Sequence, residues 1–229
     1  MNLFVVILGA LAICALLFIA AIAILFLGLR RLWRRTRPDQ LFLRTLIIAF
    51  GLGSIALPCL AFKIHERNYI LARVPEPLEV AEIEYRLEES WGVGFMPGDN
   101  ETGFVVYRLT NDSADWARKQ GSQLGDMLSG AKGAWFETPV DDGSNQAAIS
   151  RWHPYDDDPE MLATGRIRRH PPTILEYLEK YGFLIPIEGH DHEANQSIQS
   201  SGSFYSYGEG GSVTIVDPRQ GKVYFAYAG

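Results

Sequence analysis

Residues 1–29 read MNLFVVILGALAICALLFIAAIAILFLGL and contain no charged side chain. A second apolar run, residues 41–62, follows after a short segment, and Arg44 near its start is its single charged residue. A helix needs about 20 apolar residues to cross the hydrocarbon core of a bilayer. Both runs reach that length, so the sequence predicts two membrane spans, at residues 3–28 and 41–62.

The segment between the two runs is strongly basic. Five arginines lie within residues 30–40, and no lysine or arginine precedes the first run. Short loops rich in arginine and lysine stay in the cytoplasm. The sequence therefore predicts a cytoplasmic loop at residues 30–40, with both termini outside the cytoplasm. Arg44 lies one turn inside the second run, where its side chain can snorkel to the headgroups.

A cleaved signal peptide is the alternative interpretation of the first run. Signal peptides begin with a basic segment and have an apolar core of about 7–15 residues. The first run lacks that basic start, and its apolar stretch is longer. We therefore expect an uncleaved membrane anchor.

Charge is distributed unevenly along the chain. Residues 1–62 hold six Arg and one acidic residue, a net charge of +5, and residues 63–229 hold 15 Lys and Arg against 26 Asp and Glu, a net charge of −11. An acidic domain is repelled by phosphates, which argues against nucleic acid as a partner. A basic protein partner is compatible with this charge, and solubility alone is the simpler explanation.

The two cysteines, Cys14 and Cys59, both lie within the predicted spans. Residues 63–229 contain no cysteine. This excludes a disulfide framework, a cysteine nucleophile and a cysteine-ligated zinc site from that part of the chain.

Residues 63–78 end in Pro75-Glu76-Pro77 and are predicted to form a juxtamembrane linker. Residues 79–229 are numerous enough for one extracytoplasmic domain with its own core. Apolar and charged residues alternate over 81–88, which predicts a strand with one buried and one acidic face. A helix is the competing interpretation, because glutamate-rich segments favour helices.

Turn signals predict three β-hairpins in this domain. The paired strands are residues 91–96 with 102–109, 134–140 with 146–152, and 212–216 with 222–228. The last hairpin, around residues 217–221, has the clearest pattern.

Two main helices are predicted between these strands. Residues 111–129 begin with N-cap chemistry and carry an apolar stripe of Ala117, Leu124, Met127 and Leu128. A second helix follows Pro171 and Pro172 and ends at Gly182. Residues 188–203 are predicted to be a polar loop. The fold class is α+β: a two-helix transmembrane hairpin, then a domain with a mostly antiparallel sheet and two main helices.

Two histidines, His190 and His192, form the densest cluster of potential metal ligands. Imidazoles two residues apart in an extended segment can reach one zinc or copper ion. Further ligands come from His153, His170 or Glu188, and a solvated loop is the alternative. Apart from this divalent metal no cofactor is predicted, and no motif identifies a catalytic residue: Gly-x-Ser-x-Gly is absent.

Aromatic residues crowd two terminal strands, at residues 204–207 and 224–227. One face of such strands is expected to lie in the core, and the other to expose tyrosines. Exposed tyrosine is enriched at protein interfaces. The candidate binding residues are therefore Tyr205, Tyr207, Tyr224 and Tyr227, with packing between strands as the alternative.

Together these features predict a membrane-anchored, non-enzymatic protein-binding module on the outer face of a bacterial inner membrane. Such a module is a component of an envelope complex or an immunity-type protein that neutralises a toxin. One alternative is a membrane-tethered metal-binding protein or metalloenzyme that uses His190 and His192. Another is an accessory subunit of a transport assembly.

Overall fold

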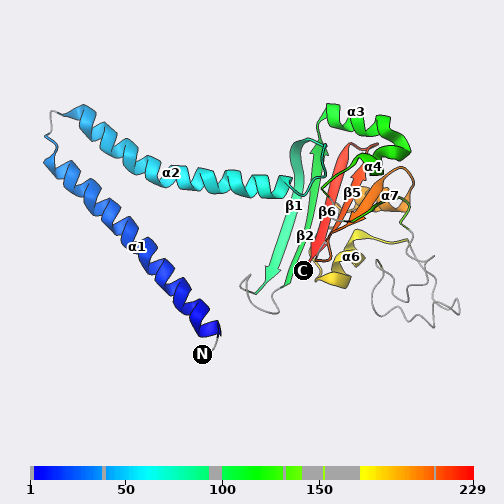
Figure 1. Ribbon diagram of the computed structural model, residues 1–229, viewed down its shortest axis with the longest axis horizontal. Helices are drawn as coiled ribbons and strands as arrows, with labels where there is room; N and C mark the ends of the chain where they lie inside the picture. The colour runs from blue at the N-terminus through cyan, green and yellow to red at the C-terminus, as the bar shows by residue number, and fades with distance from the viewer. Residues whose placement is uncertain are drawn as a thin grey trace. The chain divides into compact units, whose positions relative to one another are not determined.

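The computed structural model describes most of the chain and divides it into two compact units (Figure 1). The described residues are 3–37, 40–92, 100–130, 133–140, 152, 171–208 and 210–229. The first unit is Met1–Asn68 and the second is Tyr69–Gly229.

The first unit consists of helix α1 (Leu3–Arg35) and most of helix α2 (Leu41–Leu71). Near the connection between them, Arg44 Nη2 donates a hydrogen bond to the Thr36 carbonyl oxygen at 3.3 Å. The Arg44 guanidinium also lies 4.9 Å from the centre of the Trp33 ring. Arg44 therefore turns back towards the basic connection, as expected of a snorkelling side chain.

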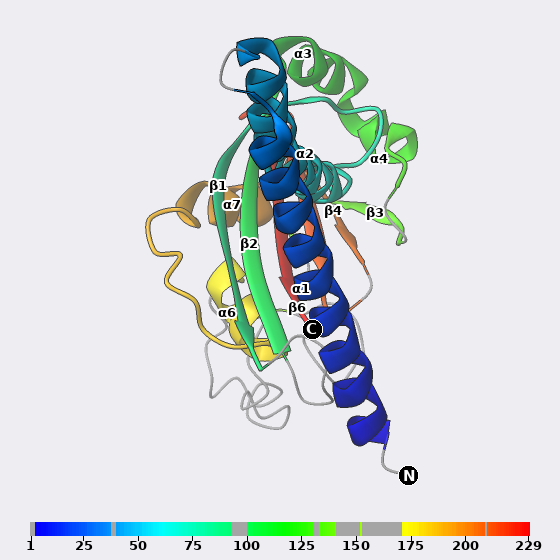
Figure 2. The ribbon, with the colours of Figure 1, turned by 90° about the vertical axis from the view of Figure 1, so that its left-hand side faces the viewer.

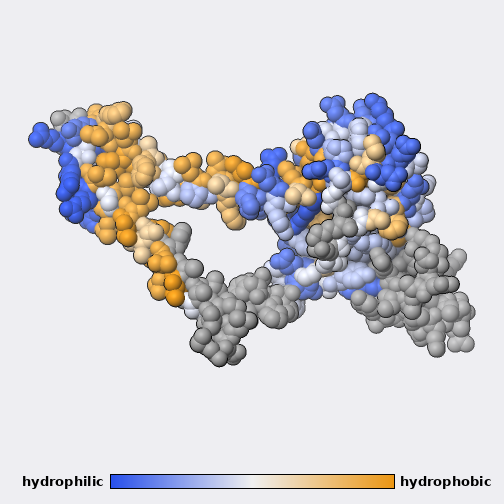
Figure 3. Space-filling view, viewed as in Figure 1, coloured by the Kyte–Doolittle hydropathy of each residue, from blue (hydrophilic) through white to orange (hydrophobic). Residues whose placement is uncertain are grey.

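Among the described residues, one helix, α2, is long and apolar enough to cross a membrane. Figure 3 shows hydrophobic residues along this helix. Leu52, Ile55 and Phe62 are among its exposed apolar side chains. The described part of α1 is helical but does not add a second helix that meets the same criterion, so the two-span hairpin stays a prediction.

The predicted linker at residues 63–78 is ordered secondary structure and core. Helix α2 continues past Phe62 to Leu71. Ile70, Val74 and Leu78 are buried in the second unit, and Tyr107 donates a hydrogen bond from its hydroxyl to the Ile70 carbonyl oxygen at 2.9 Å. Residues 69–78 therefore belong to the folded domain.

The second unit is α+β, as predicted, and its described strands form a six-stranded antiparallel sheet. The order across the sheet is β1-β2-β6-β5-β4-β3. The strands are β1 (Val80–Trp91), β2 (Asn100–Leu109), β3 (Trp135–Glu137), β4 (Phe204–Tyr207), β5 (Val213–Asp217) and β6 (Lys222–Ala228). The predicted terminal hairpin is confirmed as β5 and β6.

Of the other two predicted hairpins, the first forms with an earlier first strand than expected, and the predicted partner strand of the second, residues 146–152, lies almost wholly outside the described residues. Strand β2 pairs with all of β1, from Trp91↔Asn100 to Val80↔Leu109. Strand β3 pairs with β4, with Trp135 opposite Ser206. Residues 93–99 and 141–151 lie outside the described residues. Turn residues show where a chain reverses, but they do not show which distant strand lies alongside.

The predicted helix at residues 111–129 is confirmed in divided form. It consists of α3 (Asn111–Gln120), the 3₁₀ turn η1 (Gly121–Gln123) and α4 (Leu124–Met127), with the division at Gly121, whose φ is +55°. Thr110 is the N-cap and accepts a hydrogen bond from the Ser113 N–H at 3.2 Å. Met127 is 52% exposed, so it does not belong to the predicted buried stripe.

The second predicted helix is confirmed as α6 (Ile174–Tyr181). Thr173 caps it by accepting a hydrogen bond from the Glu176 N–H at 3.3 Å. The prediction of a polar loop at residues 188–203 is wrong, because α7 (His192–Gln199) forms within it. The apolar residues that α7 buries are Ala194 and Ile198. Because the other residues of the helix are polar, the sequence pattern of this segment is that of a loop.

The sheet has two faces, each with its own core (Figure 2). Helices α6 and α7 pack on one face, here called the α6/α7 face, and α3 and α4 pack on the other, the α3/α4 face. Phe104 and Tyr224 point to the α6/α7 face, whereas Val105 and Val223 point to the α3/α4 face with residues 70–78.

A register shift in β1 changes which side chains reach each face. The shift lies between Ile83 and Tyr85. Ile83 packs with the α3/α4 core, whereas Tyr85 and Leu87 pack with the α6/α7 core. The predicted strand forms, but its simple alternation of one buried and one acidic face is wrong, since an extra residue reverses the alternation. Glu88 consequently lies on the α3/α4 face.

Candidate functional site

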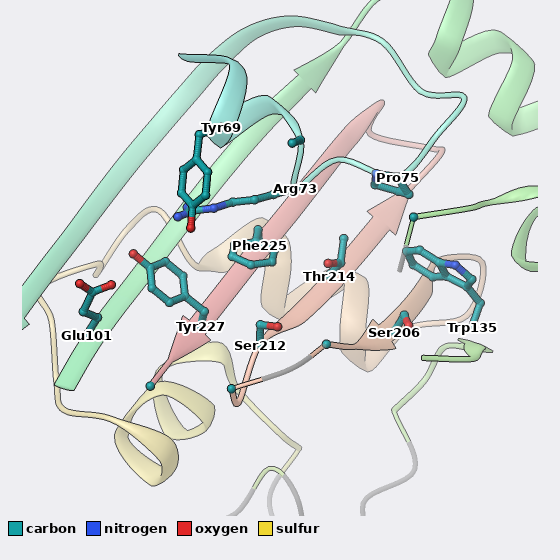
Figure 4. Close-up of a pocket in the computed structure, with 15 residues that line it drawn as sticks. Tyr69, Arg73, Pro75, Glu101, Trp135, Ser206, Ser212, Thr214, Phe225 and Tyr227 are labelled. Atoms are coloured by element: carbon teal, nitrogen blue, oxygen red, sulfur yellow. The ribbon is translucent and has the colours of Figure 1, made fainter. Parts of the chain in front are cut away.

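A pocket of about 530 Å³ opens on the α3/α4 face, on strands β4, β5 and β6 (Figure 4). We call it the sheet pocket. Among the described residues, its lining includes aromatic rings, small hydroxyl side chains, the Arg73 guanidinium and the Glu101 carboxylate. These side chains include Tyr69, Arg73, Trp135, Ser206, Thr214, Phe225 and Tyr227.

One row of residues across four strands forms the floor of the pocket. Trp135 pairs with Ser206, Ser206 with Thr214, and Thr214 with Phe225. Neighbouring strands lie about 4.8 Å apart, so the Cα atoms of Trp135 and Phe225 are separated by about 14 Å. The two residues between these rings are small, and all four residues of the row line the pocket.

The hydroxyl of Ser206 is the least satisfied polar group of this floor. Ser206 is 1% exposed, and its Oγ atom has no hydrogen-bond partner in the part of the chain that the structure describes. A buried polar group without a partner costs about 1–3 kcal/mol. A ligand atom that reaches this hydroxyl would supply the missing hydrogen bond and relieve that cost.

A second row contains Glu88, Gly103 and Tyr227. Gly103 pairs with Glu88 on one side and with Tyr227 on the other. A Cβ atom on Gly103 would lie 2.7 Å from Cζ of Tyr227, so the tyrosine ring occupies the space above the glycine. The Tyr227 hydroxyl thereby reaches across β2 and donates a hydrogen bond to Glu88 Oε1 at 2.9 Å.

Arg73 closes the pocket over these rows. Its Nη1 atom donates to Glu88 Oε1 at 2.5 Å. The guanidinium lies 5.4 Å from the ring centre of Tyr69, 5.0 Å from that of Phe225 and 4.8 Å from that of Tyr227. A cation within about 6 Å of a ring centre is attracted to it when it lies over the ring face. Arg73 is thus held by three rings and by Glu88.

Electrostatics keep this wall charged but balanced at neutral pH. Burial alone would raise the pKa of Glu88, but hydrogen bonds and the charge of Arg73 lower that pKa below its usual value. Burial alone would lower the pKa of Arg73, and the Glu88 carboxylate reverses this and raises it. Burial and Glu88 raise the pKa of Tyr227 to about 12. Tyr227 therefore stays a neutral hydrogen-bond donor.

The four candidate binding tyrosines lie on both faces of the sheet. Tyr205, Tyr207 and Tyr224 point to the α6/α7 face, and the first and third of these are buried. Tyr227 points to the opposite face and lines the sheet pocket. The α7 helix, absent from the predicted fold, packs on the face to which Tyr205, Tyr207 and Tyr224 point.

The two predicted metal ligands occupy different local structures. The His190 ring stacks on Tyr85, with ring centres 3.8 Å apart, whereas His192 is the first residue of α7. The extended segment that would direct both imidazoles to one ion is therefore not formed. Across the described ranges, no three His, Cys, Asp or Glu residues gather in a way that could hold a metal ion. His153 and His170 lie outside the described residues.

Of the side chains that line the sheet pocket, sequence reasoning found Tyr227 and missed the others, among them Arg73, Trp135 and Ser206, as well as Glu88, which pairs with Arg73. Arg73 lies in the segment that was predicted to be a linker. The residues at positions 70, 74 and 78 of this segment are apolar and are spaced four residues apart. That spacing is typical of a segment that packs against a core. The apolar spacing could therefore have indicated that residues 69–78 belong to the folded domain.

Replacing Gly103 with alanine is expected to lower the free energy of unfolding by about 1–3 kcal/mol, because the added methyl group displaces the Tyr227 ring. Chemical denaturation of the full-length protein in detergent measures this change. In a Tyr227→Ala background, Gly103→Ala should cost much less. Equal costs in both backgrounds would show that the ring does not occupy the space above Gly103.

Comparison with models of known families, with curated proteins and with solved structures finds no match for this chain. Its function is therefore inferred from the sheet pocket, the charge distribution and the apolar segments. Flat rings and hydroxyls beside a balanced ion pair are suited to binding a polar, uncharged group.

Proposed function

We propose that this protein is a membrane-anchored, non-enzymatic module that binds a protein partner through the sheet pocket. The composition of the pocket carries this proposal, because Tyr69, Arg73, Trp135 and Tyr227 meet there. Tryptophan, tyrosine and arginine are enriched among the few residues that supply most of the binding energy at protein interfaces. The volume of about 530 Å³ suits a short segment of a partner, since sites that enclose ligands span about 300–1,000 Å³.

The anchor is proposed to be a hairpin of two spans, at residues 3–28 and 41–62. The length and composition of α2 support the second span. The five arginines of residues 30–40 favour a cytoplasmic loop, with the domain on the outer face of a bacterial inner membrane.

The charge of the domain favours a basic partner. Residues 63–229 carry 15 basic and 26 acidic residues, a net charge of −11. Opposite net charges accelerate the encounter of two proteins. An envelope complex and an incoming toxin are both consistent with such a partner.

Site-specific photo-crosslinking in intact membranes tests the proposed binding site. A photoreactive residue at Thr214, inside the pocket, is expected to give one discrete adduct with a protein. The same residue at Glu179, exposed on α6 on the other face of the sheet, should not give that adduct. An adduct that forms equally from both positions, or from neither, would count against the sheet pocket as the binding surface.

Reporter fusions after Gly229 test the proposed topology. Reporters active only outside the cytoplasm should work, and reporters active only inside should not. The opposite result would place the acidic domain in the cytoplasm and overturn the proposed location.

A further inference from the structure

We infer that the sheet pocket receives an uncharged aromatic side chain with a polar end, a tyrosine or tryptophan of the protein partner. This inference rests on the proposed function and adds the chemistry of the group that is bound. Three properties of the pocket lead to it: the spacing of its walls, its charge balance and its unsatisfied hydroxyl.

The spacing of the walls selects a flat ring. The side chains of Trp135 and Phe225 stand on the same face of the sheet, with their Cα atoms about 14 Å apart. Packed aromatic rings have centres about 4.5–7 Å apart, so one ring between two others needs about 9–14 Å between the outer rings. The spacing of the two walls therefore matches that needed for one inserted ring.

The charge balance selects an uncharged group. Arg73 is paired with Glu88, and Glu88 also accepts a hydrogen bond from Arg86. Glu101, whose carboxylate lines the pocket, lies beyond Tyr227, at the end away from Trp135 (Figure 4). A charged side chain inserted between Trp135 and Phe225 would thus have no free counter-charge beside it among the described lining residues. Burying such a charge is costly.

The unsatisfied hydroxyl selects a ring with a polar end. Ser206 Oγ is buried without a partner in the described part of the chain, and Thr214 is the next residue in the same row. The hydroxyl of tyrosine or the indole N–H of tryptophan can pair with such a group, whereas phenylalanine cannot. One neutral hydrogen bond corresponds to about a tenfold preference for tyrosine over phenylalanine.

Selection of random peptides displayed on phage tests this inference with the full-length protein in lipid nanodiscs. We expect the enriched peptides to share a tyrosine or tryptophan, and its replacement with alanine should abolish binding. Thr214→Trp, which fills the gap, should weaken binding of the selected peptides by about a hundredfold or more, as loss of a central interface contact does. Glu179→Trp is the matched control and should leave binding unchanged.

A second pair of measurements keeps the result independent of folding. Thr214→Leu fills less of the gap than Thr214→Trp. It should weaken peptide binding, and its unfolding temperature should equal that of the parent protein. Ser206→Ala should reduce the affinity of a tyrosine peptide about tenfold and leave that of its phenylalanine analogue unchanged.

The inference fails if the selected peptides depend on lysine, arginine or aliphatic residues, if Thr214→Trp leaves their affinity unchanged, or if none is enriched. Crosslinking from Thr214 separates this failure from that of the proposed function. A discrete adduct from Thr214 without a requirement for an aromatic residue overturns the inference alone. If the Thr214 adduct does not form and the peptides show no requirement for an aromatic residue, both the inference and the proposed binding site are overturned.

Discussion

Replacing Arg73 with methionine is expected to lower the free energy of unfolding by about 3–5 kcal/mol, because Glu88 then keeps its charge without its principal partner. The two side chains are 14% and 15% exposed, so water screens their interaction only weakly. Denaturant unfolding of the full-length protein in detergent, followed by tryptophan fluorescence, measures the change. Loss of Arg73 also removes the cation held by Tyr69, Phe225 and Tyr227, which should loosen the wall of the sheet pocket.

The ion pair between Arg108 and Glu82 is the matched control for this prediction. These side chains are 54% and 52% exposed. Exposed ion pairs contribute about 0–1 kcal/mol, so Arg108→Met should have little effect. The double variant Arg73→Met/Glu88→Leu should be less destabilised than Arg73→Met alone, since it removes the charge that has lost its principal partner. Equal effects of Arg73→Met and Arg108→Met would show that the buried pair is solvated.

Replacing Asp217 with alanine is expected to cost about 3 kcal/mol, because several buried donors lose their acceptor together. Asp217 is fully buried at the turn between β5 and β6. Its carboxylate accepts hydrogen bonds from Ser197 Oγ at 2.7 Å, from the Arg219 N–H at 2.8 Å and from the Gln220 N–H at 3.2 Å. Asp112→Ala, at an exposed position in α3, is the control for a generic loss of acidic charge. A change below about 1 kcal/mol would contradict the structural role of Asp217.

Asp217 also makes a specific prediction about acid stability. Burial alone would raise its pKa, but hydrogen bonds from Arg219, Ser197 and Gln220 outweigh burial and lower that pKa below its usual value. The stabilisation is therefore complete above the unfolded pKa of about 3.9 and is lost as the pH falls through the lower folded pKa. Unfolding measured from pH 6 down to about pH 2 should show a flatter pH dependence for Asp217→Asn than for the parent. An unchanged slope would contradict the lowered pKa.

The residues of the candidate site could be predicted from the sequence only in part. Tyr227 was identified from the aromatic pattern of the last strand, and it does line the pocket. Glu88 was assigned to a simple acidic face, and the register shift between Ile83 and Tyr85 changed its direction. A bulge depends on how two strands pair, so the sequence of either strand alone does not predict it.

The sequence by itself determined the local features of this protein. Apolar length and composition gave the long helix α2, turn chemistry gave the hairpin of β5 and β6, and a threonine cap with a terminal glycine gave α6. These signals are local because a helix, a turn or a cap depends on residues that are close in sequence. The α+β class follows from them.

The sheet pocket exists only in the folded chain, because its residues come from distant parts of the sequence. Its floor joins Trp135, Ser206, Thr214 and Phe225, which come from four strands, and its wall joins Arg73 to Glu88 over Gly103. Which strand lies beside which depends on long-range packing of both sheet faces, and a one-residue change of register reverses the direction of every side chain. Composition and periodicity do not specify the order of the strands or their register. The set of residues that meet in the pocket could therefore be identified only from the folded chain.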